Sequence, residues 1–204
     1  NRLPKAIASA STTLGFSPLI VEFDATKSYD PDDLEEGSKA LRYTWDFDGD
    51  GYIDSYVPTD SFKYMKSGVY TAVLSVRDSK GAKTTTSIDI TVENTPPRTR
   101  IIEPREGASF SVGDRINLKG TAFDVDGGLL SGSSLSWEVL LHHDDHWHTI
   151  LEPTVGDNLV IPAAPGPIDL STAKDSYLMV SLAATDAGGL STTATTIMKP
   201  NLVD

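Results

Sequence analysis

The chain has 204 residues, a formal net charge of −12 and a sequence pI of about 4.6. This acidic balance argues against nucleic acids and anionic membrane surfaces as partners, because both require basic patches. No apolar run is long enough for a membrane-spanning helix. The chain contains no cysteine, so disulfides and thiolate zinc sites are excluded. Each domain must therefore be stabilised by its apolar core, helped by any metal that it binds.

Short alternating segments of apolar and polar residues, separated by Gly, Pro and Asp, fill the first half of the chain. Such segments predict strands with one buried face, and helix signals are scarce. We expect strands over residues 6–10, 19–23, 41–47, 62–64, 70–76 and 88–92. About seven strands in a segment of this length are typical of an immunoglobulin-like β-sandwich.

The strand over residues 41–47 leads into an acidic loop with the pattern Asp-x-Asp-x-Asp-Gly-x-x-Asp. In calcium loops of this spacing the glycine permits a sharp turn, and carboxylates and one carbonyl bind the ion. The twelfth position holds Val57 instead of the usual glutamate. An acidic turn in which Asp46 accepts hydrogen bonds from loop amides is therefore the alternative. The predicted calcium ligands are Asp46, Asp48, Asp50, Tyr52 through its carbonyl, and Asp54.

Two consecutive prolines, Pro96 and Pro97, mark the expected domain boundary, because they stiffen the chain and remove two hydrogen-bond donors. We therefore predict one domain over residues 1–95 and a second over residues 96–204.

The second half repeats features of the first, with Trp137 in the place of Trp45. Its strand over residues 178–184 runs into an aspartate, as the strand over residues 70–76 does. This recurrence predicts a second immunoglobulin-like sandwich, so that the whole chain is all-β. The second copy is longer in its middle, where we expect a histidine-rich hairpin and a Pro/Gly loop from Pro153 to Pro167.

Aspartates at the ends of predicted strands recur in both halves. The first half has Asp30, Asp32 and Asp78, and their counterparts are Asp124, Asp126 and Asp186. A sandwich can bring such residues together, either to bind calcium or to cap turns through side-chain hydrogen bonds.

All four histidines of the chain lie in one short segment, as His142, His143, His146 and His148. In an extended strand His146 and His148 share a face and can ligate zinc, copper or nickel if a third ligand comes from elsewhere. The alternative is a hairpin with Asp144 and Asp145 at its turn, in which the histidines only hydrogen-bond or pair with aspartate. A metal-dependent enzyme at this cluster would also need a water-activating base and a pocket, and the sequence identifies neither.

The three tryptophans are expected to differ in role. Trp45 and Trp137 are predicted to be the buried tryptophans of the two sandwiches. Trp147 lies in a polar segment, where its indole could stack on a sugar ring or could pin a hairpin to the core.

The first half resembles the PKD domain, the immunoglobulin-like module named after the polycystic kidney disease protein, over residues 4–95. The resemblance rests on Phe23-Asp24-Ala25-Thr26-x-Ser28-x-Asp30-Pro31-Asp32, Tyr43-x-Trp45-Asp46-Phe47-Asp48-Gly49-Asp50-Gly51, Gly68-Val69-Tyr70-Thr71 and Val76-Arg77-Asp78-x-x-Gly81. It implies a β-sandwich, an extracellular location and a role as a spacer or binding module. It also implies calcium binding near the Asp-Pro-Asp turn, as in the PKD domains attached to secreted bacterial collagenases.

The second half resembles modules that accompany secreted bacterial quinoprotein sugar dehydrogenases. That resemblance rests on Leu135-Ser136-Trp137-x-Val139-x-Leu141-His142-His143 and on His146-x-His148. It implies a module beside an enzyme rather than an enzyme.

We therefore expect a non-catalytic, calcium-stabilised, monomeric binding or spacer module, with neighbouring domains in a larger secreted or cell-surface bacterial protein. The chain is expected to be a mature or excised fragment, so that a missing signal peptide says nothing about location. The alternative is an adhesion module for polysaccharide or a surface protein, with Trp147 and the Pro153–Pro167 loop as its contact.

Overall fold

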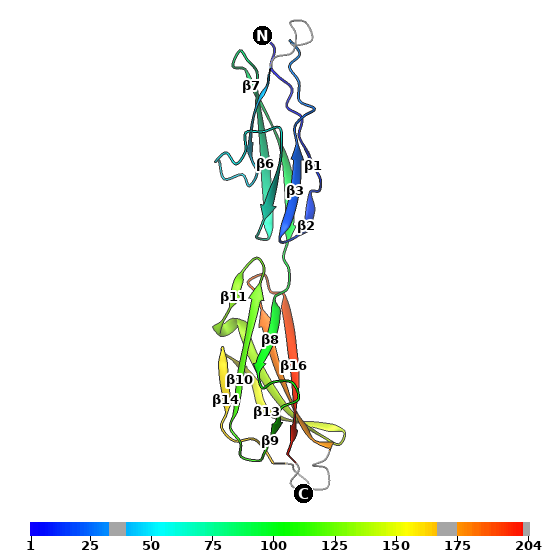
Figure 1. The fold of residues 1–204 in the computed structure, drawn as a ribbon, viewed down its shortest axis with the longest axis vertical. Helices are drawn as coiled ribbons and strands as arrows, with labels where there is room; N and C mark the ends of the chain where they lie inside the picture. The colour runs from blue at the N-terminus through cyan, green and yellow to red at the C-terminus, as the bar shows by residue number, and fades with distance from the viewer. Residues whose placement is uncertain (33–39, 167–174, 202–204) are drawn as a thin grey trace. The chain divides into compact units, whose positions relative to one another are not determined.

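The structure is a computed structural model that describes residues 1–32, 40–166 and 175–201. The chain divides into two compact units, Asn1–Thr95 and Pro96–Asp204. Apart from one 3-10 turn, Gly132–Ser134, the regular elements of the described residues are all strands (Figure 1). The prediction of an all-β fold with immunoglobulin-like sandwiches is confirmed. Within these ranges no helix is long and apolar enough to cross a membrane.

The first unit consists of a three-stranded and a four-stranded sheet. The smaller sheet has the order β1 (Ser9–Ala10), β3 (Leu19–Asp24) and β5 (Thr59–Tyr64). The larger sheet has the order β2 (Leu14–Phe16), β7 (Lys83–Glu93), β6 (Gly68–Arg77) and β4 (Arg42–Asp46). All pairings are antiparallel except that of β2 with β7.

The core between these sheets is built from aromatic rings that alternate inward along the strands. Trp45 is fully buried, and its ring lies 5.3 Å from Phe23 and 5.4 Å from Phe47. Tyr64 is also buried, and its hydroxyl donates a 2.7 Å hydrogen bond to the carbonyl of Phe47. The core therefore extends to Phe47, which follows the end of β4 and begins the acidic loop.

The second unit also has two sheets. Its larger sheet has the order β13 (His146–Val155), β12 (Leu135–His143), β15 (Tyr177–Thr185), β16 (Ser191–Pro200) and β9 (Ser109–Phe110). In the other sheet the long β10 (Ile116–Asp124) pairs with β11 (Gly128–Leu130), β14 (Asn158–Ile161) and β8 (Arg98–Glu103).

Trp137 occupies the centre of the second core, fully buried, and its indole nitrogen donates to the carbonyl of Gly156 over 3.0 Å. Strand β10 of the other sheet packs closely against Trp137 and Leu182, because Gly120 has no side chain at this point. A β-carbon at Gly120 would lie 2.3 Å from a methyl carbon of Leu182.

The predicted loop from Pro153 to Pro167 is wrong where strands run through it. Pro153 to Val155 complete β13, and Asn158–Ile161 form β14 against β10. Pro153 is accommodated because β13 is an edge strand and because its pairing with β12 is irregular at this residue, so that no paired residue stands opposite Pro153. Pro167 itself lies outside the described residues.

Candidate functional sites

The acidic loop after β4 is folded by its own carboxylates. Asp46 accepts hydrogen bonds from the amides of Gly49 at 2.7 Å and Gly51 at 2.9 Å, and Asp54 accepts one from Phe47 at 2.7 Å. Gly49 has a φ of 75°, and a β-carbon there would lie 3.0 Å from a backbone oxygen of β6. Glycine is therefore needed both for the backbone conformation and for the space.

Three carboxylates of this loop converge. One oxygen from each of Asp46, Asp48 and Asp50 lies within 4.8 Å of the others. Partial burial raises the pKa of Asp48, and the charges of Asp50, Asp54 and Asp46 raise it further. Hard carboxylate oxygens at this separation suit calcium, although the loop amides already occupy several of them. Asp54 lies outside this convergent group, and the side chain of Tyr52 is exposed.

The aspartates near the start of the first unit serve turns and an ion pair. Buried Asp30 accepts a 2.9 Å hydrogen bond from the amide of Asp32. Asp32 forms a 2.8 Å ion pair with Arg2, and hydrogen bonds from the Arg2 amide and side chain lower its pKa. Within the described ranges, Asp30, Asp32 and Asp78 are not among the carboxylate groups that converge within 4.8 Å.

Asp78 caps the turn between β6 and β7. Its carboxylate accepts the amides of Lys80 at 2.9 Å and Ala82 at 2.8 Å, together with the side-chain amide of Asn1 at 2.9 Å. Burial opposes ionisation of Asp78, but these hydrogen bonds outweigh it and lower its pKa.

The corresponding aspartates of the second unit interact with one another. Asp124 lies at the end of β10 and is only 3% exposed. Its pKa is raised mainly by burial, and the carboxyl group of Asp126 and the charge of Asp186 raise it further. The Oδ1 atom of Asp124 is buried and has no hydrogen-bond partner. Gly127 permits this packing, because a β-carbon there would lie 2.4 Å from the other oxygen of Asp124. The structure therefore places three interacting acidic groups near one another and leaves Oδ1 of Asp124 buried without a hydrogen bond.

The histidine-rich segment is a hairpin. Strands β12 and β13 are joined at Asp144 and Asp145, and His143 pairs with His146 across them. His143, His146 and His148 lie on one face, and one ring nitrogen from each lies within 4.8 Å of the others. Burial and the neighbouring His143 and His146 lower the pKa of His148. The sequence predicted His146 and His148 as a pair of ligands, and the structure adds His143 as the third member of the group.

His142 points to the other face of the hairpin with Trp147. Its ring lies 4.5 Å from that of Trp147 and 4.7 Å from that of Tyr177. Trp147 is 43% exposed, so its indole both packs on the hairpin and faces solvent. The sequence offered these two roles as alternatives.

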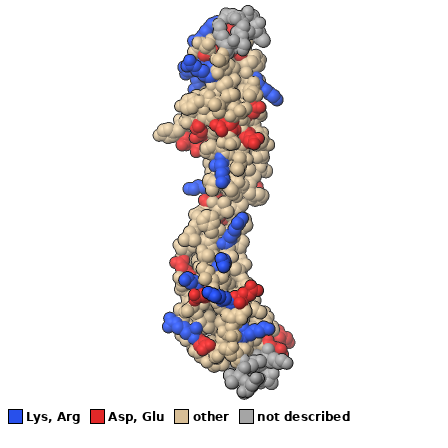
Figure 2. Space-filling view, viewed as in Figure 1, with Lys and Arg blue, Asp and Glu red and all other residues tan. Residues whose placement is uncertain are grey.

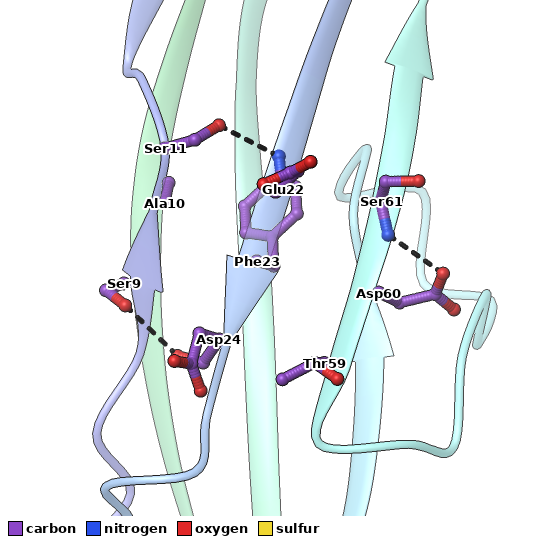
Figure 3. Close-up of a pocket in the computed structure, with 9 residues that line it drawn as sticks. All are labelled: Ser9, Ala10, Ser11, Glu22, Phe23, Asp24, Thr59, Asp60 and Ser61. Atoms are coloured by element: carbon purple, nitrogen blue, oxygen red, sulfur yellow. Dashed lines mark hydrogen bonds between the residues drawn. The ribbon is translucent and has the colours of Figure 1, made fainter.

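A shallow polar depression of about 580 Å³ crosses strands β1, β3 and β5 (Figure 3). Hydrogen bonds from Thr26 lower the pKa of Asp24, and those from Ser55 and Ser61 lower the pKa of Asp60. Both groups are therefore carboxylates at neutral pH and hold no proton to donate. This depression is not predicted by the sequence, because most of its lining residues are outward-facing polar residues of three strands that are not consecutive along the chain.

Charge on the surface agrees with the acidic composition. On the face drawn in Figure 2, the described Lys and Arg side chains are dispersed rather than gathered into a patch. This distribution gives a polyanion no continuous surface to bind on that face.

Comparison with known proteins identifies the first unit. Residues 1–92 match the family model for the PKD domain. The PKD1 domain of Vibrio anguillarum Epp is 34% identical, with 46% of this chain and 96% of that chain covered and a TM-score of 0.36. The first unit is a PKD domain. It is also similar to the PKD1 domain of the Vibrio cholerae metalloprotease PrtV, at 29% identity over 45% of this chain and 99% of that chain, with a TM-score of 0.36.

Over both units the chain is similar to a solved structure of carbohydrate-binding modules from the β-sandwich superfamily. The identity is 20%, the match covers 98% of this chain and 99% of that chain, and the TM-score is 0.38. The family model ends within the PKD domain. The resemblance of the second unit to modules beside quinoprotein dehydrogenases therefore stays a prediction.

Proposed function

We propose that this chain is a non-catalytic spacer and binding segment of a larger secreted or cell-surface bacterial protein, that it is monomeric, and that calcium stabilises it. The observation that carries the proposal is the PKD match over residues 1–92. PKD and immunoglobulin-like domains are generally non-catalytic modules.

Calcium binding is supported by the acidic groups themselves. In the first unit the residues that would hold the ion are Asp46, Asp48 and Asp50, whose carboxylate oxygens converge within 4.8 Å. In the second unit they would be Asp124, Asp126 and Asp186, which interact electrostatically although the three do not all converge within that distance. A buried carboxylate oxygen without a partner is costly, and a hard divalent cation would both satisfy it and offset the repulsion among its neighbours.

Thermal unfolding of the full chain, first in chelator and then in millimolar calcium, tests this proposal. Binding to the folded state alone should stabilise it by about 2.7 kcal/mol when calcium is at 100 times its Kd. Asp124→Asn should weaken the response of the second unit, whereas Glu152→Gln, which removes an equal charge at an exposed position of β13, should leave it intact. An unfolding temperature that is the same with and without calcium would refute the calcium part of the proposal.

A second candidate function, recognition of a polysaccharide or a surface protein, is favoured by the exposed indole of Trp147. The ring is held edge-on by His142 and Tyr177, and an ordered, solvent-facing indole can stack on a sugar. Trp147→Ala should abolish binding on a glycan array or in a pull-down with surface protein. Phe123→Ala, which removes an exposed ring from β10, is the control. Full binding by the Trp147 variant would exclude this contact.

A further inference from the structure

We propose that His143, His146 and His148 form a binding site for a divalent transition metal ion of the zinc class. The site lies at the turn end of the hairpin formed by β12 and β13. It is independent of the carboxylate groups to which the proposed function assigns calcium, and it goes beyond that function.

The backbone register brings the three rings together. Asp144 has a φ of 50°, and with Asp145 it forms a tight turn that places His143 directly opposite His146. His148 follows His146 by two residues, so the strand period returns it to the same face, opposite Leu141. Two strands joined by a two-residue turn thus deliver three imidazoles to one face.

The distances suit a metal ion. The Nε2 atoms of His143 and His148 are 2.9 Å apart, and one nitrogen from each of the three rings lies within a 4.8 Å group. Nitrogens about 2.0–2.1 Å from a tetrahedral zinc ion lie roughly 3.3 Å from each other. Small side-chain rotations of His146 and His148, which lie nearer the surface than His143, would bring all three into that arrangement.

One turn aspartate occupies the position of an outer-shell partner. The Nδ1 atom of His146 lies 3.3 Å from a carboxylate oxygen of Asp145. The Nδ1 atom of His143 has no hydrogen-bond partner among the described residues, and the nearest carboxylate oxygen of Asp144 lies 3.7 Å from it. Metal-binding histidines generally direct their second nitrogen to a carboxylate, which fixes the tautomer and orients the ring. Here this pairing leaves Nε2 of His146 for the ion, Nε2 of His143 already faces His148, and the carboxylates of Asp144 and Asp145 offset the charge of the ion.

The donor set selects the class of metal. Three imidazole nitrogens favour zinc, copper or nickel over calcium, which takes oxygen ligands. The side chain of His146 is half exposed, so a water molecule can reach the remaining coordination position. His143 is 6% exposed and anchors the group to the core, whereas the other two ligands can be replaced without opening the sandwich.

Isothermal titration of the full chain with zinc, in excess calcium, tests the site. We expect one zinc ion per chain, and a loss of at least about 100-fold in affinity in both His146→Ala and His148→Ala. His142→Ala is the matched control: it removes an imidazole of the same hairpin from the opposite face and should retain native affinity. Asp145→Asn should weaken zinc binding by about 10–100-fold, the usual cost of losing an outer-shell partner. Cobalt in place of zinc should give the absorption of a tetrahedral site, lost in His148→Ala.

Several results would overturn the site: no zinc binding at 0.1 mM, native affinity in His146→Ala or His148→Ala, or an equal loss in His142→Ala. Circular dichroism melts establish that each variant is folded. The calcium response of the chain is measured alongside, and it should not change in the histidine variants. Failure of the zinc site and failure of the calcium proposal are thereby distinguishable.

Discussion

Two tyrosine hydroxyls in the PKD domain make the same kind of hydrogen bond in different surroundings. Tyr64 donates to the carbonyl of Phe47 inside the core, and Tyr70 donates to the carbonyl of Lys66 at the surface. Tyr64→Phe leaves a buried carbonyl without that donor and should destabilise the domain by about 1–3 kcal/mol. Tyr70→Phe leaves a carbonyl that water can reach, so its cost should be about 0.5 kcal/mol.

Urea unfolding of the full chain measures both variants, and each serves as the control for the other because the deleted atom is the same. A cost for Tyr70→Phe equal to or above that for Tyr64→Phe would contradict the argument that burial makes the hydrogen bond of Tyr64 the more stabilising of the two.

At the scale of single elements, the turns after β6 and β15 share one device. Asp78 accepts the amide of Ala82 at 2.8 Å, and Asp186 accepts that of Leu190 at 2.9 Å. Because the pKa of Asp78 is lowered from 3.8 in the folded state, its contribution to stability is complete above pH 3.8 and disappears as the pH falls through its folded value.

Asp78→Asn should therefore destabilise the PKD domain at pH 7, and the difference from the native chain should shrink as the pH falls below 3.8. Urea unfolding at a series of pH values measures it. Asp89→Asn, which changes an exposed carboxylate on β7, controls for the general effect of charge. A destabilisation that stays constant down to the lowest pH would assign the effect to shape rather than to the ionised carboxylate.

Elements with strong alternation were predictable from the sequence, and those defined by partners distant in sequence were not. β4 and β6 carry apolar side chains on one face, and the loop glycines mark a turn. β2 was missed because Leu14 and Phe16 are 56% and 60% exposed, and its parallel pairing with β7 leaves no local signal. The histidine group likewise depends on register, since a shift of one residue would send His143 to the opposite face.

At the scale of the whole molecule, a net charge of −12 makes the stability of the chain sensitive to cations and protons. Asp124 of the second unit and Asp78 of the PKD domain should respond differently to acid, because their pKa values are shifted in opposite directions. The folded state of the second unit raises the pKa of Asp124 above 3.8, so ionisation of this group opposes folding at neutral pH. Protonation removes that penalty as the pH falls through the raised value, while Asp78 in the PKD domain remains ionised.

In chelator, the second unit should therefore become more stable on mild acidification from pH 7, whereas the PKD domain should gain nothing from Asp78. Asp124→Asn should raise the stability of the second unit at pH 7 and flatten its pH profile, because the amide carries no charge to protonate. Calcium should flatten the same profile in the native chain, since a bound cation offsets the charge that protons otherwise remove. Calorimetric melts of the native chain and the variant over this pH range measure all three effects. If the stability of the second unit depends on pH in the same way in the native chain and in Asp124→Asn, protonation of Asp124 is not the cause of that dependence.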